Sequence, residues 1–571
     1  MKITHFVSTS WLILPLALTT SCTDIIKSAP TNTVAETSYC TTNATFSTSY
    51  TIEGNAYYRK RNFTVAGLGA ISGNMAIRRA EVQVLNAAGT IVQCTETDAS
   101  GYYTFDIPDD GSTYTVKVLS RSYNAFNKVS VLGNPTTNIP YSITTTFVAD
   151  ANKTLANLVA HADTSLDSTL RGGAFNILDQ IYLANDYLLN NTSVGAFTVD
   201  HKVQAYWTKG VNPVTYFGGD PDSGVSFYIP GEDQLYILGG IDGDVTVQDT
   251  DHFDNSVIIH EYGHFLEDNY SASDSPGGTH YGLFVIDPRL AWSEGFSTYF
   301  ASRVTGDPIY RDTVGIGGGY GYYYDMENNL NEDNDPQDMP TAGQLGEGGF
   351  RELAVSRMLW ATTDAPVSMP FSELWDAYVG DFQSTLPFRE MSLFLKAQAD
   401  NAGTNISSLL DDDDKEMTAT RAHYGVRDNS GTANVAGAAA CRWTIQASAK
   451  IPISGNVFDR SNQFYSNDFY YFYHGGGTLS VTLDYDVTGT TAADLDLYVY
   501  KDGYTFGVGN DLLTYSNKEK GVGVGEEDGF ETISISAPAG PYIINVMYYN
   551  DGAGSPATVY NIDTAGNLIC R

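Results

Sequence analysis

Polar and apolar residues alternate in short runs along the first part of the chain. Within Ala80–Leu85 and Tyr114–Val118 about every second side chain is apolar, and turn residues at Asn86–Gly89 and Thr97–Tyr103 separate the runs. Alternation with a period of two is the pattern of a strand that buries one face, and frequent turns are typical of antiparallel sheets. We therefore expect residues 50–148 to form a β-sandwich.

The apolar period lengthens after residue 149. Ala174–Leu189 repeats apolar residues three and four positions apart, which is the spacing of an amphipathic helix. The strand pattern returns after residue 434, where Leu479–Val487 carries an apolar residue at every second position. We expect a multidomain chain in which an α+β region, residues 149–433, is flanked by two β-sandwiches, the second formed by residues 434–571.

Residues 1–21 have the pattern of a cleaved export signal. A basic start is followed by the mostly apolar run Phe6–Leu18, and small residues precede Cys22. The run is shorter than the roughly 20 residues that span a bilayer as a helix. Cys22 resembles the processed cysteine of bacterial lipoproteins, but Thr19 stands where those usually have an aliphatic residue, so a lipid anchor and secretion both stay open. We expect an extracytoplasmic protein with residues 22–49 as a tether.

Acidic residues strongly outnumber basic ones. The 67 Asp and Glu against 31 Lys and Arg give a formal net charge of -36. Such a chain is repelled by phosphate backbones and by anionic membrane surfaces. We therefore exclude nucleic acid as a partner and expect membrane contact only through a lipid on Cys22. The oligomeric state is left open.

Cysteine usage fits an oxidising compartment. Four cysteines remain when Cys22 is set aside, and they allow three pairings. The economical pairing keeps each bridge within one sandwich and joins Cys40 to Cys94 and Cys441 to Cys570. None of the four has a C-x-x-C spacing, so we expect no thiolate metal site.

The pentapeptide HEYGH, residues His260–His264, carries the strongest chemical signal in the chain. It follows the apolar run Ser256–Ile259, and two histidines four residues apart share one face of a helix. Their imidazoles can chelate one Zn²⁺ ion, and Glu261 can reach a water molecule at that ion. We predict one catalytic zinc ion with His260 and His264 as ligands and Glu261 as the catalytic base.

A catalytic zinc ion needs a third protein ligand. A histidine six residues after His264 is absent, because Tyr270 stands there. Glu294 lies in the helix-like stretch Pro288–Phe300, where a carboxylate among apolar residues is costly unless it binds a charged group. Glu294 is therefore the predicted third ligand. His280 is the rival, since imidazole is a good zinc ligand, but it follows two glycines in an expected loop.

Two helical histidines with a downstream glutamate resemble the gluzincin metallopeptidases, of which thermolysin is the familiar member. The run HEYGHFLEDNYSASDSPGGTHYG and the later DPRLAWSEGF are similar to uncharacterised bacterial lipoprotein metallopeptidases. The resemblance implies a zincin-like α+β domain that hydrolyses peptide or protein substrates, with the ligands and base predicted above. Thermolysin-like enzymes have an aspartate four residues after the glutamate ligand, where this chain has Thr298.

The flanking regions carry resemblances of their own. AEVQVLNAAGT with the later TETDASGYYTFDIP resembles the carboxypeptidase regulatory-like domain, and ADLDLYVYKDG resembles the bacterial pre-peptidase C-terminal domain. Together these resemblances imply a secreted or surface-anchored zinc metalloendopeptidase.

Two other functions stay open. One is a non-enzymatic surface adhesin or glycan-binding protein on an inactive metallopeptidase scaffold, although such a scaffold commonly loses the base that Glu261 provides. The other is a zinc aminopeptidase, which needs an acidic anchor for the substrate amine. Glu232 and Asp233 are candidates for that anchor, but we expect them in a turn.

The transition-state stabiliser and the cleavage specificity also stay open. The candidates for the stabiliser are His280 and the tyrosines Tyr320, Tyr322, Tyr323 and Tyr324. Two acidic runs are candidates for Ca²⁺ binding: Asp242, Asp244 and Asp249, and separately Asp333, Asp335 and Asp338. Neither fits the helix–loop–helix calcium spacing, so a solvated acidic surface is the default interpretation.

Overall fold

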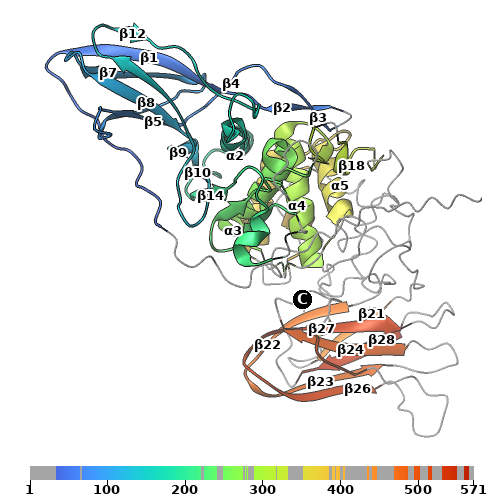
Figure 1. Ribbon diagram of the computed structural model, residues 1–571. Coiled ribbons are helices and arrows are strands. Elements are labelled where there is room, and N and C mark those ends of the chain that lie inside the picture. The colour runs from blue at the N-terminus through green and yellow to red at the C-terminus, as the bar shows by residue number, and fades with distance from the viewer. Residues whose placement is uncertain are drawn as a thin grey trace, which may run out of the picture.

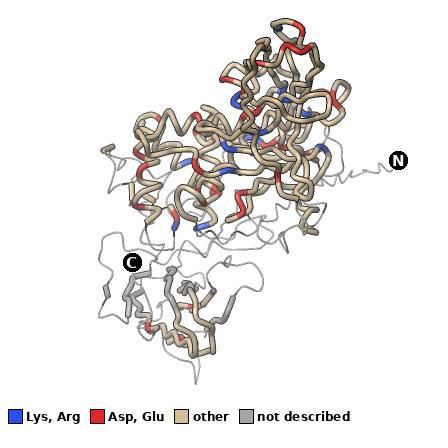
Figure 2. Tube along the Cα trace, turned by 90° about the vertical axis from the view of Figure 1, so that its left-hand side faces the viewer, with Lys and Arg blue, Asp and Glu red and all other residues tan. Residues whose placement is uncertain are grey.

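The computed structural model describes most of residues 34–331 and 352–404, with short gaps that include 241–247 and 281–287, and a set of strands between 434 and 564. The expected export signal and Cys22 lie outside the described residues. None of the described helices is both long and apolar enough to cross a membrane. Figure 1 shows a stranded N-terminal part, a central group of helices and a stranded C-terminal part, as expected for a multidomain chain. Acidic residues are scattered along the described trace (Figure 2).

The N-terminal part consists of two packed sheets. In the first, β1 (Ser49–Tyr58) pairs antiparallel with β4 (Met75–Ala76) and β7 (Tyr102–Pro108), and parallel with β12 (Lys153–Thr154) and β13 (Leu158–Ala160). The second has the order β11 (Ser142–Val148), β8 (Thr113–Leu119), β5 (Glu81–Leu85), β6 (Ile91–Glu96). Phe105 of β7 packs on Phe147 of β11, with ring centroids 6.1 Å apart. The buried faces of the alternating strands thus meet between the sheets.

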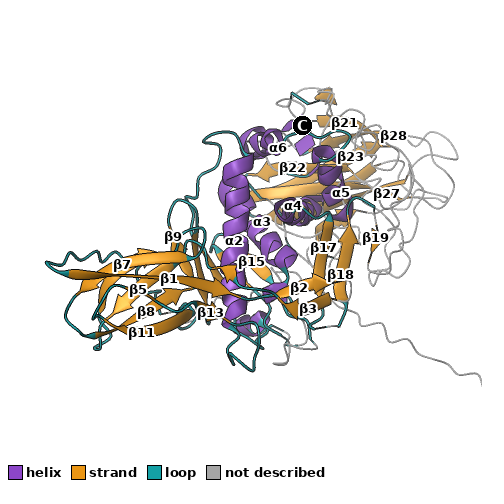
Figure 3. Cartoon of the chain, turned by 90° about the horizontal axis from the view of Figure 1, so that it is seen from above, coloured by secondary structure: helices purple, strands orange, loops and turns teal. Residues whose placement is uncertain are grey.

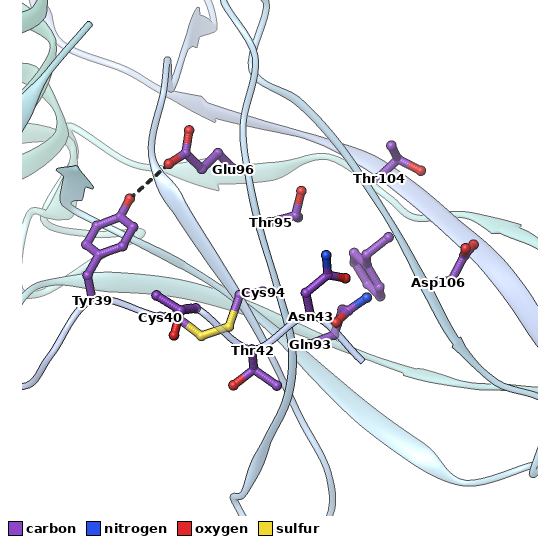
Figure 4. Close-up of a pocket in the computed structure, with 12 residues that line it drawn as sticks. Tyr39, Cys40, Thr42, Asn43, Gln93, Cys94, Thr95, Glu96, Thr104 and Asp106 are labelled. Carbon is purple, nitrogen blue, oxygen red and sulfur yellow. Dashed lines mark hydrogen bonds between the residues drawn. A yellow bond between two sulfur atoms is a disulfide. The ribbon is translucent and has the colours of Figure 1, made fainter. Parts of the chain in front are cut away.

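A disulfide bond joins Cys40 to Cys94 on β6, as the pairing within the first sandwich predicts. A pocket of about 460 Å³ lies beside it (Figure 4), where the Tyr39 hydroxyl donates a hydrogen bond to Glu96. The pocket is lined by none of the predicted site residues. The second predicted bridge involves Cys570, which lies outside the described residues.

A five-stranded mixed sheet connects this sandwich to the helices. Its order is β15 (Phe227–Ile229), β16 (Gln234–Tyr236), β14 (Val203–Tyr206), β10 (Lys128–Leu132), β9 (Arg121–Tyr123). The three inner strands are parallel, and both edge strands are antiparallel to their neighbours. β9 and β10 come from the range 50–148, which we expected to form the sandwich alone. This part of the prediction is wrong, because β10 pairs with β14, which lies about seventy residues later in the chain, and not with a strand of the sandwich.

The helices pack against this sheet and against each other. α2 (Arg171–Asn191) contains the helix predicted for residues 174–189. α3 (Asn255–Tyr270) lies beside α4 (Pro288–Thr305), and α5 (Glu352–Thr363) packs on α4 (Figure 3). α6 (Phe371–Ala377) and a π-helical turn (Tyr378–Phe382) follow. One continuous apolar core joins these helices to the first sandwich.

Smaller elements surround the helices. An antiparallel sheet of β17 (Ile309–Thr313), β18 (Tyr320–Asp325) and β19 (Leu330–Asn331) follows α4 in the chain, and β17 contacts both α3 and α4. A hairpin is formed by β2 (Arg61–Thr64) and β3 (Gly67–Ile71), and two 3-10 turns are η1 (Pro213–Phe217) and η2 (Asp251–Phe253). η2 leads directly into α3.

The C-terminal part again has two sheets. One has the order β20 (Asn434–Val435), β21 (Ala440–Ile445), β28 (Thr558–Asp563), β23 (Gly477–Tyr485), β26 (Phe530–Ala537). The other has the order β22 (Asp468–His474), β27 (Gly540–Tyr549), β24 (Asp494–Lys501), β25 (Leu512–Ser516). Leu479, Val481 and Leu483 of β23 are buried, as their alternation predicts.

Candidate active site

The HEYGH pentapeptide lies in the middle of α3. The carboxylate of Asp254, just before the helix, accepts hydrogen bonds from the backbone amide and the hydroxyl of Thr313 on β17, at 2.6 and 2.9 Å. This contact fixes the start of α3 against the strand that follows α4. His260 and His264 are one helical turn apart, and both imidazoles are largely buried on the side that faces α4.

Two glycines allow the helices to approach closely. A Cβ atom at Gly263 would lie 2.9 Å from Oγ and 3.0 Å from Cα of Ser297 on α4. A Cβ atom at Gly295 would lie 2.5 Å from Cβ of Val355 on α5. Any larger residue at either position would push the helices apart. Gly263 therefore lets α4, with Glu294, lie close to α3, and Gly295 lets α5 lie close to α4.

Three potential ligand atoms converge between α3 and α4. Nε2 of His260 and Nε2 of His264 are 3.1 Å apart. Oε2 of Glu294 lies 3.1 Å from the first and 3.3 Å from the second. Atoms that ligate one tetrahedral zinc ion at about 2.0 to 2.1 Å are about 3.3 Å from each other. The observed separations therefore fit one zinc ion.

Hydroxyl groups of α4 contact the other nitrogen of each ring. Nδ1 of His260 lies 3.1 Å from Oγ1 of Thr298. Nδ1 of His264 lies 3.1 Å from Oγ of Ser293 and 3.2 Å from Oγ of Ser297. A histidine that donates through Nδ1 keeps the Nε2 lone pair available for a metal ion. Thr298, which departs from the thermolysin-like pattern, thus contacts a ring nitrogen through a hydroxyl group.

Ser293 also links His264 to a buried carboxylate. Its hydroxyl donates a hydrogen bond to Oε2 of Glu267, which is only 1% exposed. Because the hydroxyl proton is directed to Glu267, its oxygen is left to accept a hydrogen bond from the histidine ring. We did not predict this contact from the sequence. The available signal was an acidic residue three positions after His264, on the same face of the helix.

Glu261 directly follows His260 in α3, one of the three residues whose ligand atoms converge. It is 6% exposed, and its Oε2 has no hydrogen-bond partner in the described part of the chain. Burial raises the pKa of Glu261 to about 8. Buried carboxyl groups without partners are costly, and strongly shifted pKa values are concentrated at functional sites. Glu261 is therefore suited to exchange a proton near neutral pH.

Burial and mutual charge interactions also shift the pKa values of His260, His264 and Glu294. Burial lowers the pKa of His260. For His264 burial acts in the same direction, but the carboxylates of Glu294, Glu261 and Glu267 together outweigh it and raise the pKa to about 9. Despite burial, the imidazoles of His280 and His264 hold the pKa of Glu294 well below its usual range. The carboxylate is thus ionised and available to a cation.

His280 lies on the other side of Glu294. Its Nε2 is 3.5 Å from Oε1 of Glu294, and its Nδ1 is 2.8 Å from Oε2 of Glu352 on α5. The converging ligand atoms come from His260, His264 and Glu294, without His280. The structure therefore brings Glu294, and not its rival, together with the two helical histidines.

The tyrosines that are candidates for stabilising the transition state lie in different environments. Tyr324 is fully buried and donates its hydroxyl to a backbone carbonyl of α5, so it serves packing. Tyr322 packs on Tyr310, whose ring centroid lies 5.6 Å from that of His260. We did not single out Tyr310 from the sequence, because nothing in its surroundings distinguishes it. The side chain of Tyr320 lies outside the described part.

The candidate amine anchors lie elsewhere. Glu232 and Asp233 occupy the turn between β15 and β16, as expected. Asp233 accepts a hydrogen bond of 2.8 Å from the side chain of Asn269, near the C-terminal end of α3. Asn269 is five residues beyond His264, or about 7.5 Å along the helix axis. Asp233 therefore contacts α3 more than one helical turn beyond His264.

Comparison with known proteins relates the central region to proteases. Residues 201–344 match the family described as the mycolysin C-terminal domain, and this range contains the whole of α3 and α4. An uncharacterized protein of Archaeoglobus fulgidus is 40% identical over 64 residues, which cover 11% of this chain and 19% of that protein. The chain thus matches about a fifth of that relative's length. The family match supports a protease-related protein.

A solved structure resembles a smaller part of the chain. It is the pre-peptidase C-terminal domain of collagenase from Bacillus anthracis, with 9% identity, a TM-score of 0.14, and coverage of 22% of this chain and 85% of that one. A TM-score of this size is too low to establish a common fold.

Proposed function

We propose that this chain is an extracytoplasmic zinc metalloendopeptidase whose central α+β region is zincin-like. The observation that supports this most strongly is the mutual distance of 3.1 to 3.3 Å among three ligand atoms from α3 and α4. The buried side chain of Glu261 accompanies them, and its Oε2 has no hydrogen-bond partner among the described residues. Three protein ligands with a neighbouring general base form the minimal set for metal-assisted hydrolysis.

In this proposal His260, His264 and Glu294 hold the zinc ion. When bound, zinc supplies Lewis acidity that polarises the substrate carbonyl and makes water more acidic. Glu261 takes the proton from the attacking water and returns it to the leaving amine. Thr298 and Ser293 keep the imidazole rings oriented through Nδ1. The substrate is a peptide or protein, and a lipid on Cys22 would hold the enzyme at the cell surface.

Zinc-dependent cleavage by the full chain tests the proposal. The protein is stripped of metal, reloaded with zinc, and incubated with a peptide library whose internal cleavage is read by mass spectrometry. Metal content is measured in parallel. We expect one zinc ion per chain and internal cleavage only after zinc is restored.

A pair of matched substitutions completes this experiment. His264→Ala removes one proposed ligand, and His201→Ala removes an exposed histidine outside the cluster. We expect zinc and cleavage to be lost in the first variant and kept in the second. Removal of single amino-terminal residues, without internal cleavage, would instead favour the aminopeptidase. A zinc-loaded protein without any cleavage would favour the non-enzymatic alternative.

A further inference from the structure

A second group of acidic side chains lies beside the start of α3. Asp249 precedes η2, Asp251 begins η2, and Asp312 lies in β17. Each contributes a carboxylate oxygen within 4.8 Å of those of the other two. The backbone of Asp249 also forms a β-bridge with Val314, just beyond β17. The group therefore connects the segment before α3 with the strand after α4.

Each of these carboxylates has one buried oxygen to which no described residue outside the group donates a hydrogen bond. Oδ1 of each of the three aspartates is inaccessible to solvent and has no hydrogen-bond partner among the described residues. Asp251 is only 3% exposed, and its other oxygen accepts a hydrogen bond from the hydroxyl of Ser226. The buried hydroxyl of Thr250 between them is also without a partner there. Unsatisfied buried charges are costly, so the arrangement points to a missing positive group.

None of the ion pairs in the described part of the chain brings a cationic side chain to these three carboxylates. Arg311, next to Asp312 in the chain, directs its guanidinium to Asp307 at 2.6 Å. Asp254 is different from the other aspartates, because Thr313 satisfies its carboxylate. Burial and the neighbouring Asp312 raise the pKa of Asp249 well above its usual range. Without a cation, Asp249 therefore holds its proton at pH values at which an aspartate in water would be ionised.

We propose that Asp249, Asp251 and Asp312 bind a calcium ion that ties the start of α3 to β17. All the donors are carboxylate oxygens on a loop, a 3-10 turn and a strand end. Ca²⁺ accepts six to eight oxygen ligands at about 2.3 to 2.6 Å in flexible geometry, whereas Mg²⁺ demands a near-ideal octahedron. Backbone carbonyls and water would complete the shell.

This site differs from the acidic runs seen in the sequence. Of the first run, Asp242 and Asp244 lie outside the described residues, and Asp249 is grouped with Asp251 and Asp312 instead. The second run, Asp333, Asp335 and Asp338, also lies outside them. Because the ion would join segments next to the two helices that carry the zinc donors, it would stabilise their relative position.

Calcium titration of the full-length protein tests the site. Zinc-loaded protein in calcium-free buffer is titrated with Ca²⁺, and separately with Mg²⁺, by calorimetry, and its thermal unfolding is recorded with and without Ca²⁺. We expect one tight calcium ion, at least tenfold weaker Mg²⁺ binding, and a higher unfolding temperature with Ca²⁺. Asp251→Asn and Asp312→Asn should each weaken Ca²⁺ binding at least tenfold.

The control is Asp106→Asn, which removes an exposed carboxylate of β7 and should leave the tight site unchanged. Since the two site variants relieve charge repulsion, they should unfold at a higher temperature than the unsubstituted protein when Ca²⁺ is absent. Absence of a tight calcium ion, or tight binding that persists in both site variants, would overturn the proposal. Equally tight Mg²⁺ binding would overturn the choice of calcium. Zinc content is measured throughout, so failure here is distinguishable from failure of the zinc proposal.

Discussion

The hydroxyl of Thr298 lies 3.1 Å from Nδ1 of His260, one helical turn beyond Glu294 on the same helix. α4 therefore presents both the third ligand candidate and a group that orients the first. A hydroxyl can accept the Nδ1 proton in a hydrogen bond, as a carboxylate would, without adding a negative charge. Such outer contacts fix the orientation and the tautomer of metal-binding histidines.

Removing this hydroxyl should weaken zinc binding. In Thr298→Val the side chain keeps its shape but can no longer accept the hydrogen bond, and loss of such contacts typically costs about 10- to 100-fold in metal affinity. We expect a loss in that range, measured by competition with a zinc chelator. Thr298→Ser, which keeps the hydroxyl, should remain close to the unsubstituted protein. Equal affinity in all three proteins would show that the contact has no role in zinc binding.

The close approach of α3 and α4 should be sensitive to Gly263. In Gly263→Ala the new methyl group would meet the backbone and side chain of Ser297. Overpacking of this kind costs about 1–3 kcal/mol, and the shift of α4 should carry Glu294 away from the histidines. We expect a lower unfolding temperature together with weaker zinc binding.

A glycine with free space around it provides the control for this prediction. Gly380 lies in the π-helical turn, and a Cβ atom there would meet nothing within 4 Å. Gly380→Ala should therefore leave zinc affinity unchanged and keep or raise stability, since alanine favours helical conformations. Unchanged zinc affinity in Gly263→Ala would contradict the role given to the close helix contact.

The metal-free protein should lose stability as the pH rises from about 6.5 to 9. The pKa of Glu261 is raised from 4.5 to about 8, and that of His264 from 6.5 to about 9. In this window the folded state holds more protons than the unfolded chain, so the free energy of unfolding falls with rising pH. His260, whose pKa is lowered from 6.5, acts in the opposite direction only below this window.

The helical circular dichroism signal measures this effect, because the described helices all belong to the central region. Denaturant unfolding of the zinc-free protein is followed at several pH values within the window. Glu261→Gln removes one of the two groups and should flatten the fall up to about pH 8. A stability that stays constant or rises across the window would contradict the pKa shifts. Zinc affinity should instead increase with pH, since the ligands bind metal in their deprotonated forms.

The sequence allows prediction of the features that local spacing determines. Histidines four residues apart must share a helix face, and Glu294 could be chosen because a carboxylate in an apolar helix needs a charged partner. Alternation likewise revealed the strands β5, β8 and β23. It could not reveal that β9 and β10 leave the sandwich, because a strand's pattern shows which face is buried but does not identify its hydrogen-bonding partner.

The contacts that surround the site depend on how α4 packs on α3. Thr298 and Ser293 are small hydroxyl residues that fit many positions of a helix, so their roles follow only from the rotation of α4 about its axis. Asp251 and Asp312 are likewise separated by about sixty residues and meet only because β17 returns to the start of α3. Interactions of this kind require the three-dimensional structure.

In the proposed function, Glu261 acts as the catalytic base beside a zinc ion held by His260, His264 and Glu294. This role is tested by comparing peptide hydrolysis by the unsubstituted protein and Glu261→Gln at equal, measured zinc content. Glutamine keeps the size of the side chain but cannot take a proton, and general bases contribute at least about 100-fold to the rate. We expect full zinc occupancy in both proteins and at least a 100-fold slower hydrolysis in the variant. Undiminished hydrolysis by zinc-loaded Glu261→Gln would contradict the account.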